Sequence, residues 1–263
     1  MKPVSSLPHD EAIHLRGLFF DLDDTVLTHG VLTRCAYDAL WNMHDDGLLL
    51  VAVTGRPFGL AEVIARQWPI AGCIAENGAL YVVREGSALR VSDACEQAER
   101  LERRQRLEAL GERVRAAVPD ARPTDDRYAR RSDFTWDIGE HVHPPEDRVR
   151  AIIREIEAAG ARWSRSSIHL HATFEGDDKA SGAIRFCARE FGEDEGSATF
   201  RFAFAGDSPN DAPCFSAFRT TFGVDNVRSA VARLSVPPRY VAGHPMGEGF
   251  AEIAGELVRK RKS

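Results

Sequence analysis

Apolar runs that end in polar residues recur along this chain. The clearest runs cover residues 17–20, 48–53 and 200–205, and apolar residues at helical spacing follow at 34–46 and 57–67. A continuous apolar run of this length indicates a strand that is buried on both faces. Such strands alternating with helices predict an α/β fold, in which a Rossmann-like core of parallel strands carries helices on both faces.

The middle of the chain follows a different pattern. The elements that its periodicity predicts are a charged helix at 94–118, a half-buried strand at 128–138, a helix at 145–159 and alternating strand residues at 161–174. This order is typical of an antiparallel sheet with helices on one face. We therefore predict a core formed by residues 1–85 and 171–263, into which residues 86–170 are inserted as an α+β cap.

Composition excludes several classes of protein. The chain has 263 residues, of which 43% are hydrophobic, so it can bury a sizeable core. Its net charge of −6 has the wrong sign for a general binder of nucleic acid or anionic membranes. No apolar run is long enough to cross a membrane and the first residues resemble no signal peptide, so we expect a cytoplasmic protein. Five cysteines without a CxxC pair indicate neither a disulfide framework nor a zinc site.

Two pairs of aspartates follow predicted strands. Asp21 and Asp23 come after the first strand, and Asp207 and Asp211 come after the run that ends at 205. Because the carboxyl ends of parallel strands meet at one edge of a sheet, we expect these groups to lie together. Converging carboxylates repel one another unless a cation intervenes, and oxygen ligands suit Mg²⁺. For either string alone, a turn or helix cap is the competing interpretation.

Candidate phosphate ligands come from two further segments. Lys179 stands at the start of a predicted helix, where the helix dipole favours an anion, so an anionic partner would explain this position. Thr54, Gly55 and Arg56 add a hydroxyl group, a site of close approach and a guanidinium directly after a strand. An exposed lysine and an ordinary capping turn are the competing interpretations.

In this order, the four segments resemble the motifs of the haloacid dehalogenase-like superfamily of phosphohydrolases. The matching strings are DLDDT at 21–25, VTGR at 53–56, DK at 178–179 and GDSPND at 206–211. The resemblance implies that Asp21 is the nucleophile, which forms an aspartyl-phosphate, and that Asp23 is the general acid and base. It also implies that Thr54 and Lys179 hold the phosphoryl group. Asp21, the backbone carbonyl of Asp23, Asp207 and Asp211 would hold Mg²⁺ or its waters.

The position of the insertion resembles the second cap type of this superfamily. That subgroup includes Cof-type, sucrose, trehalose and mannosyl-phosphoglycerate phosphatases and the phosphomannomutases. Asn77-Gly78 matches the turn of the subgroup after its third strand, although Asn-Gly is also an ordinary hairpin turn. The resemblance implies substrate contacts from Gly55, Arg56, Asn77 and the cap.

Arginines and histidines of the cap are candidates for binding the leaving group of a substrate. We name Arg131 and His169 first; the remaining candidates are Arg127, Arg130 and His171. His169 and His171 share one face of a predicted strand, and we expect that face either to border the active site or to be solvated. A metal site at the two histidines lacks a third ligand.

Together these features predict a Mg²⁺-dependent phosphatase of a small phosphorylated metabolite, with a sugar phosphate as the favoured substrate. A phosphomutase and a catalytically silent metabolite-binding protein are the alternatives. A dehalogenase is disfavoured because such enzymes lack the acid-base aspartate that stands here as Asp23. We expect no nucleic-acid or membrane partner, and the oligomeric state is left open.

Overall fold

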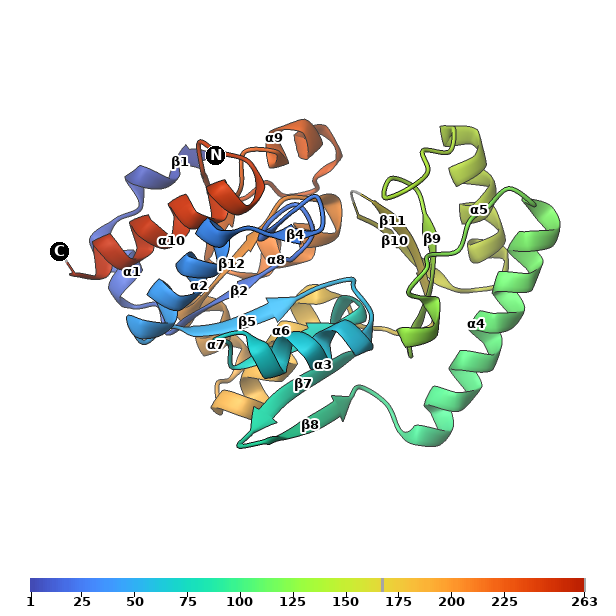
Figure 1. Ribbon diagram of the computed structural model, residues 1–263, viewed down its shortest axis with the longest axis horizontal. Coiled ribbons are helices and arrows are strands. Elements are labelled where there is room, and N and C mark those ends of the chain that lie inside the picture. The colour runs from blue at the N-terminus through green and yellow to red at the C-terminus, as the bar shows by residue number, and fades with distance from the viewer. Residues whose placement is uncertain (167, 263) are drawn as a thin grey trace.

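The computed structural model describes residues 1–166 and 168–262 and divides into a larger core and a smaller cap (Figure 1). The core is built on a nine-stranded sheet. In spatial order its strands are β1 (Lys2–Pro3), β14 (Tyr240–Val241), β13 (Thr220–Gly223), β12 (Phe202–Gly206), β2 (Gly17–Phe20), β5 (Leu49–Val53), β6 (Gly72–Ala75), β7 (Leu80–Glu85) and β8 (Ala88–Asp93). Neighbours from β1 to β6 are parallel, whereas β7 and β8 form an antiparallel extension.

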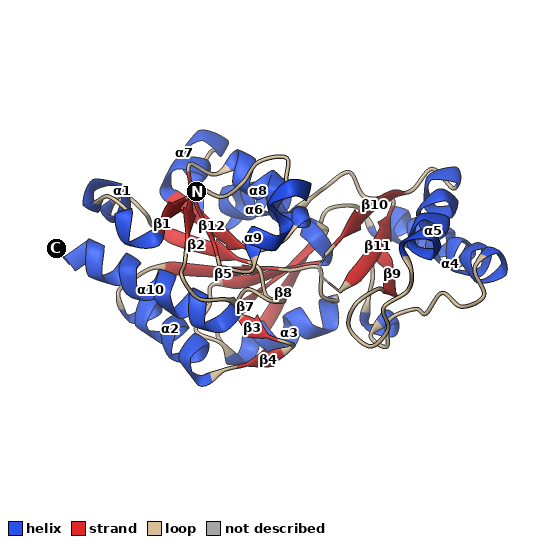
Figure 2. Cartoon of the chain, turned by 90° about the horizontal axis from the view of Figure 1, so that it is seen from above, coloured by secondary structure: helices blue, strands red, loops and turns tan. Residues whose placement is uncertain are grey.

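Helices cover both faces of this sheet (Figure 2). One face carries α1 (His9–Ile13), α2 (Arg34–Asp45), α3 (Phe58–Gln67) and α10 (Met246–Lys262). The other carries α6 (Lys179–Phe186), α7 (Glu195–Arg201), α8 (Ala212–Ala217) and α9 (Val227–Ala230). The predicted α/β fold with a Rossmann-like core is therefore confirmed.

Strand β2 shows why the apolar runs are continuous. Successive side chains of a strand point to opposite faces, and here both faces are covered. Leu18 and Phe20 pack under the first helical layer, while Phe19 packs under the second. Every residue of the strand is buried, so its sequence contains no polar position.

The cap consists of a three-stranded antiparallel sheet and two helices. Its strands lie in the order β10 (Arg162–Arg165), β11 (His169–Thr173) and β9 (Asp133–Asp137), and its helices are α4 (Gln97–Ala117) and α5 (Glu146–Ala158). Leu170 and Ala172 of β11 pack with apolar residues of both helices. The opposite face of β11 carries His169 and His171, which are each 1% exposed. The solvated face that was one of our two expectations is therefore wrong.

Two expected strand segments differ from the structure. The segment expected as a strand at 128–138 begins as a short helical turn, Arg127–Ala129, and becomes a strand only at Asp133. The segment expected at 161–174 contains two strands, β10 and β11, which pair as a hairpin. The alternation of side chains is the same in both halves of a hairpin, so it could not show where the chain turns.

The sheets place the boundaries of the cap a few residues away from the predicted 86 and 171. Strand β8 belongs to the core sheet, and β11 continues in the cap sheet to Thr173. The chain therefore passes from core to cap between Asp93 and Gln97, and returns between Thr173 and Lys179. Buried Arg100 of α4 joins the two crossings, because it forms ion pairs with both Asp93 and Glu175.

A small hairpin, β3 (Leu27–Thr28) with β4 (Val31–Leu32), follows the first acidic motif. Helical turns of three to five residues connect the remaining elements: η1 (Val4–Ser6), η2 (Glu76–Gly78), η3 (Arg127–Ala129), η4 (Cys187–Phe191), η5 (Pro209–Asp211) and η6 (Val231–Arg233). Within the described part of the chain, no helix combines the length and apolar character that a membrane crossing requires.

Candidate active site

Three buried aspartates lie together at the carboxyl edge of the core sheet. Asp21 follows β2 and Asp207 follows β12, and these two strands are parallel neighbours. Asp211 comes from the helical turn η5. One carboxylate oxygen from each aspartate lies within 4.8 Å of the others. A search of the described residues for three or more acidic, histidine or cysteine side chains that could hold a metal ion finds this cluster.

Lys179 reaches this cluster from the first residue of α6. Its Nζ lies 2.7 Å from Oδ1 of Asp21 and 2.7 Å from Oδ1 of Asp211. Lys179 is 1% exposed, so carboxylates rather than water surround its ammonium group. Asp178 caps the helix through the backbone N–H of Ser181, which fixes where α6 begins and hence where Lys179 stands.

The cluster has more negative than positive charge, and the pKa values of its members reflect this. Burial raises the pKa of Asp21, and although Lys179 lowers it, the charges of Asp211 and Asp23 add to the increase. Burial, Asp211 and Asp21 raise the pKa of Asp207 well above its usual value. Burial would lower the pKa of Lys179, but Asp21 and Asp211 outweigh it and raise that pKa. A hard divalent cation with oxygen ligands would offset the excess charge, so the donor set fits one.

The second predicted motif contributes Thr54 and Arg56 at the end of β5. Thr54 is buried, and its Oγ1 accepts a hydrogen bond from the backbone N–H of Arg56 at 3.0 Å. The guanidinium of Arg56 donates to both oxygens of Asp23, at 2.8–3.0 Å. The carboxylate of Asp23 thus lies with Arg56 rather than in the three-aspartate cluster, which leaves its backbone carbonyl as the metal ligand that we predict.

Arg56 also connects the core to the cap. Its Nη2 donates to Oε1 of Glu140 at 3.1 Å, and Oε2 of Glu140 lies 2.8 Å from Nε2 of His169. The hydrogen bond from His169 and the charge of Arg56 lower the pKa of Glu140 to about 2. A continuous chain of polar contacts therefore runs from Asp23 through Arg56 and Glu140 to His169.

A second set of buried contacts holds the cap loop on the core. Glu76, in η2 after β6, accepts hydrogen bonds from the backbone N–H groups of Phe58, Arg131 and Ser132. Arg130 of the cap donates to the backbone carbonyl of Gly55 at 2.9 Å. These contacts fix the face of the cap sheet above the carboxyl edge of the core sheet.

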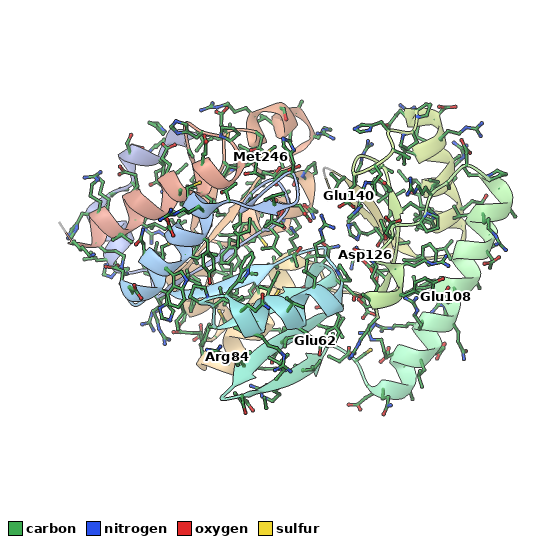
Figure 3. All side chains as sticks on the ribbon, in the orientation of Figure 1. Glu62, Arg84, Glu108, Asp126, Glu140 and Met246 are labelled. Atoms are coloured by element: carbon green, nitrogen blue, oxygen red, sulfur yellow. The ribbon has the colours of Figure 1, made fainter. Side chains whose placement is uncertain are left out.

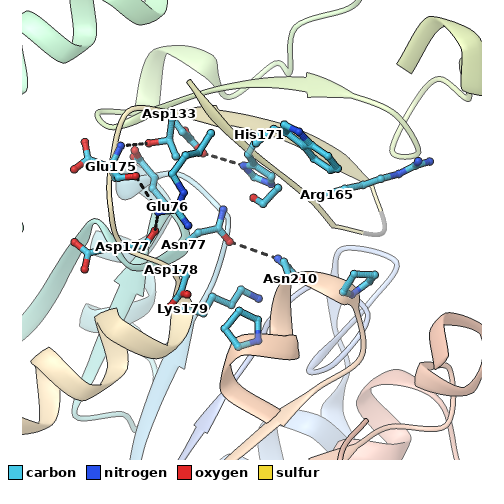
Figure 4. Close-up of a pocket in the computed structure, with 16 residues that line it drawn as sticks. Glu76, Asn77, Asp133, Arg165, His171, Glu175, Asp177, Asp178, Lys179 and Asn210 are labelled. Atoms are coloured by element: carbon cyan, nitrogen blue, oxygen red, sulfur yellow. Dashed lines mark hydrogen bonds and ion pairs between the residues drawn. The ribbon is translucent and has the colours of Figure 1, made fainter. Parts of the chain in front are cut away.

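A cavity of about 300 Å³ lies between the core and the cap (Figure 4). Lys179 and Asn210 reach it from the core, and His171 reaches it from the cap sheet. Asn77 also lines it, and its Oδ1 lies 3.4 Å from Nδ2 of Asn210. An adjoining enclosed recess is lined by Asp21, Asp23, Gly55, Ser166, His169, His171, Ser208 and Asn210. The cavity thus leads to the carboxylates from the direction of the cap.

The structure brings most of the predicted site residues together. The residues that we predict for catalysis or metal binding lie in or beside the three-aspartate cluster; they are Asp21, Asp23, Thr54, Lys179, Asp207 and Asp211. Of the predicted substrate contacts, Gly55, Asn77 and His169 line the cavity or its recess, and Arg56 holds Asp23. Arg131 differs: it is exposed, lines neither space, and lies over the ring of Phe58 at 3.6 Å.

Several residues of the site escaped the sequence prediction. Asp133 and Glu140 lie on the face of the cap toward the core, and Glu76 and Asn210 lie on the core side. The sequence could have indicated Asp133, because it begins an alternating strand. The structure shows that the polar side of this strand faces the core rather than solvent. Glu140 and Glu76 had none, because their partners are distant in sequence.

Fold and site together place a buried acidic cluster at the carboxyl edge of a parallel sheet, beneath a cap. Residues 18–98 match the sequence model of a family described as haloacid dehalogenase-like hydrolase. The predicted resemblance to this superfamily is therefore confirmed, and with it the class of enzyme, a hydrolase. Comparison with curated proteins finds no match to the chain.

Solved structures of the same fold cover nearly the whole chain. A crystal structure of a protein from Thermoplasma acidophilum has a TM-score of 0.69 at 19% identity, covering 92% of this chain and 98% of its own. The C-terminal domain of trehalose-6-phosphate phosphatase from C. albicans has a TM-score of 0.68 at 12% identity, covering 98% and 99%. The sucrose-phosphatase from Synechocystis has a TM-score of 0.63 at 13% identity, covering 92% and 98%. At these identities the likeness establishes the fold, including the cap.

Proposed function

We propose that this protein is a Mg²⁺-dependent phosphatase that hydrolyses a small phosphorylated metabolite, with a sugar phosphate as the favoured substrate. The observation that carries the proposal is the buried cluster in which Asp21 contacts Lys179 at the inner end of a cavity roofed by the cap. A carboxylate nucleophile and an ammonium group that can neutralise a phosphoryl oxygen are the groups that such a transfer needs.

Each predicted residue has a role that its position supports. In the first step an oxygen of Asp21 bonds to phosphorus, and the bond from phosphorus to the oxygen of the leaving group breaks while Asp23 gives that oxygen a proton. In the second step Asp23 takes a proton from water, whose oxygen bonds to phosphorus and releases Asp21. Lys179 and Thr54 would hold the phosphoryl oxygens throughout.

Asp21, Asp207 and Asp211, with the backbone carbonyl of Asp23, would hold Mg²⁺. When bound, the ion supplies positive charge against the phosphoryl group. The fit rests on three buried carboxylates whose oxygens lie within 4.8 Å of one another and of which two share the ammonium group of Lys179.

The choice of a sugar phosphate rests on the cavity. Its volume of about 300 Å³ lies at the lower end of the usual range for small-molecule sites, and polar side chains line it from both sides. Two of the structures that share this fold are sucrose-phosphatase and trehalose-6-phosphate phosphatase. A small polyhydroxy compound that carries one phosphate suits both the volume of the cavity and the polar side chains that border it.

Release of inorganic phosphate from p-nitrophenyl phosphate and from a panel of sugar and polyol phosphates tests the proposal. We expect turnover with Mg²⁺, a loss of activity in excess chelator, and recovery when Mg²⁺ is added back. Full activity in chelator would refute the metal dependence, and transfer of phosphate between positions of one sugar without release would favour a mutase. Binding without turnover would favour a catalytically silent protein.

The role of Asp23 is tested by Asp23→Asn. We expect kcat/KM for a sugar phosphate to fall by roughly 10²- to 10⁴-fold, because the amide cannot donate the proton. The loss should be smaller for p-nitrophenyl phosphate, since nitrophenolate leaves without protonation. Equal losses for both substrates would argue against an acid-base role.

A further inference from the structure

One ring nitrogen of His171 has a hydrogen-bond partner, and the other has none. Its Nδ1 lies 2.9 Å from Oδ2 of Asp133, and the residue is 1% exposed. Its Nε2 has no hydrogen-bond partner; among the described residues the other buried side-chain atom in that state is Nε of Arg185. His171 lines the cavity beside Lys179 (Figure 4). An unpaired buried polar atom is costly, so one in a residue that lines a binding cavity points to a partner that the protein itself does not supply.

The neighbours of His171 determine which of its nitrogen atoms carries the proton. Arg130, whose side chain is fully buried, donates to both oxygens of Asp133 at 3.0–3.1 Å. Burial would raise the pKa of Asp133, but Arg130 and His171 together lower it to about 2, so this carboxylate accepts hydrogen bonds and cannot donate them. Nδ1 of His171 must therefore carry the proton.

The ring of His171 is also neutral near pH 7. Burial lowers the pKa of His171 to about 4, although the bond to Asp133 opposes this change. A neutral ring with its proton on Nδ1 has a lone pair on Nε2. The open atom that faces the cavity is thus an acceptor.

The chemistry of an acceptor limits what can occupy this position. A phosphoryl oxygen is itself an acceptor and carries negative charge, so it belongs beside Lys179 rather than beside Nε2 of His171. The metal-competent cluster consists of Asp21, Asp207 and Asp211 and does not include His171. The remaining candidates are donors: a water molecule in the empty site, and a donor that a substrate brings in its place, which in a phosphorylated metabolite of the sugar or polyol type is a hydroxyl group.

Gly55 lies directly against the ring of His171. A Cβ atom at position 55 would lie 3.1 Å from Nε2, closer than an ordinary contact, so glycine keeps this side of Nε2 free of a side chain. His169 provides a contrast on the same strand face, because its Nε2 is already occupied by Glu140 at 2.8 Å. The two histidines therefore differ in function: His169 joins the cap to the core, and His171 presents a free acceptor.

We propose that His171 recognises the leaving group of the substrate by accepting a hydrogen bond from one of its hydroxyl groups, with Asp133 as the residue that positions the ring. This rests on the proposed phosphatase function and extends it. The substrate class becomes phosphate esters whose leaving group carries a free hydroxyl within reach of Nε2. Analogues that lack this hydrogen should be discriminated against.

The test compares substrates that differ in one hydroxyl group. The probes are p-nitrophenyl phosphate, a panel of hexose, pentose and polyol phosphates, and the monodeoxy and deoxyfluoro analogues of the best panel member. Fluorine replaces the hydroxyl oxygen but cannot donate a hydrogen bond. In the wild-type enzyme we expect one position at which deoxy and deoxyfluoro analogues both lose roughly tenfold in kcat/KM, the scale of one hydrogen bond.

Variants locate that loss at His171. In His171→Asn the amide can still bond to Asp133 but nothing replaces Nε2, so we expect the preference for the hydroxyl substrate over its deoxy analogue to fall from roughly tenfold to about onefold. His171→Gln, whose amide reaches further, should restore part of the preference. His141→Asn, the same change at an exposed cap histidine, should leave it unaltered.

Nuclear magnetic resonance of ¹⁵N-labelled histidine provides a readout that does not depend on activity. It should show the proton of His171 on Nδ1 in the wild-type protein and on Nε2 in Asp133→Asn, whose amide N–H would face Nδ1.

Three outcomes would overturn the proposal. They are a proton on Nε2 in the wild-type enzyme, a deoxyfluoro analogue that keeps full activity while the deoxy analogue loses it, and a hydroxyl preference that survives in His171→Asn. A panel in which no sugar or polyol phosphate exceeds p-nitrophenyl phosphate in kcat/KM would also overturn it. In that case turnover of p-nitrophenyl phosphate would still support the phosphatase itself, whereas a chain inactive on every phosphate ester would refute both.

Discussion

Two clusters of buried charge border the cavity, one in the core and one in the cap. In the core, Asp21, Asp207 and Asp211 share a single ammonium group, that of Lys179. In the cap, Arg130 forms paired hydrogen bonds with Asp126 and Asp133. The first cluster has three carboxylates for one ammonium group, and the second has two carboxylates for one guanidinium that donates hydrogen bonds to both of them.

The pKa values show the same difference. Burial and neighbouring carboxylates raise the pKa of Asp21 and of Asp207. In the cap, burial acts in the same direction on Asp126 and Asp133, but Arg130 outweighs it and lowers the pKa of both. Burial alone therefore does not mark a binding site. The useful sign is a buried cluster whose carboxylates have raised pKa values, whereas a cluster whose arginine lowers the pKa of every carboxylate stabilises the fold.

The largest expected effect comes from removing one carboxylate from the three-aspartate cluster. Asp21→Asn should lower kcat by roughly 10³-fold or more, because the amide cannot form the acyl-phosphate. Its melting temperature without metal should stay the same or rise, since one of the repelling carboxylates is gone. Steady-state kinetics and thermal unfolding measure the two effects.

Asp24→Asn is the matched control for this change. Asp24 is the acidic neighbour in the same motif, lies outside the metal-competent cluster, and its side chain faces that of His29. We expect it to keep most of the activity. A large drop in stability in Asp21→Asn would contradict the comparison, because it would mean that Asp21 contributes to the fold as the cap residues do.

Removing the arginine of the cap cluster should cost stability. Arg130→Met removes the cationic partner of buried Asp133 and of half-buried Asp126, and we expect a loss of about 3–5 kcal/mol in the free energy of unfolding. Arg131→Met is the matched control, because Arg131 is exposed and stacks on Phe58, and it should cost about 1 kcal/mol or less. Urea unfolding of both variants measures the difference; equal costs would mean that the cap cluster is not structural.

The smallest effect is a pH dependence of stability that His171 should introduce. Its pKa is about 4 in the folded protein and near 6.5 in the unfolded chain, so as the pH falls the unfolded chain takes up the proton first. Stability from this group is present above pH 6.5 and is lost as the pH falls toward 4. Between pH 7.5 and 5, wild type should lose about 2 kcal/mol relative to His171→Asn.

Denaturant unfolding at several pH values measures this difference. His141→Asn serves again as the exposed control. A constant difference between His171→Asn and wild type would show that the pKa of His171 is the same in the folded and unfolded states, and would contradict the expectation.

The core was predictable from sequence because its signals are local. Continuous apolar strands record burial on both faces, as in β2, and the acidic residues follow them directly, so Asp21 and Asp207 could be placed at one edge before the structure was known. The spacing of the motifs carried the remainder, including Lys179. These features depend on neighbours in sequence and on the rule that parallel strands end at one edge.

The cap was less predictable because its contacts are distant in sequence. Arg131 and Arg130 are adjacent and chemically identical, yet one lies exposed on Phe58 and the other is buried against Asp133. Strand β8, at the exposed edge of the core sheet, carries few buried residues, so no apolar pattern showed that it belongs to the core. Glu140 meets Arg56 across 84 residues, and no short-range signal reports such a pair.

Arg100 marks the hinge between the core and the cap. Both chain crossings between core and cap are bound to this one side chain, through Asp93 on the outgoing path and Glu175 on the returning path. The contact between Arg56 and Glu140 lies at the opposite end of the interface, where Glu140 is labelled in Figure 3. Any rotation of the cap about Arg100 would therefore move the far edge of the interface, at Glu140, the most.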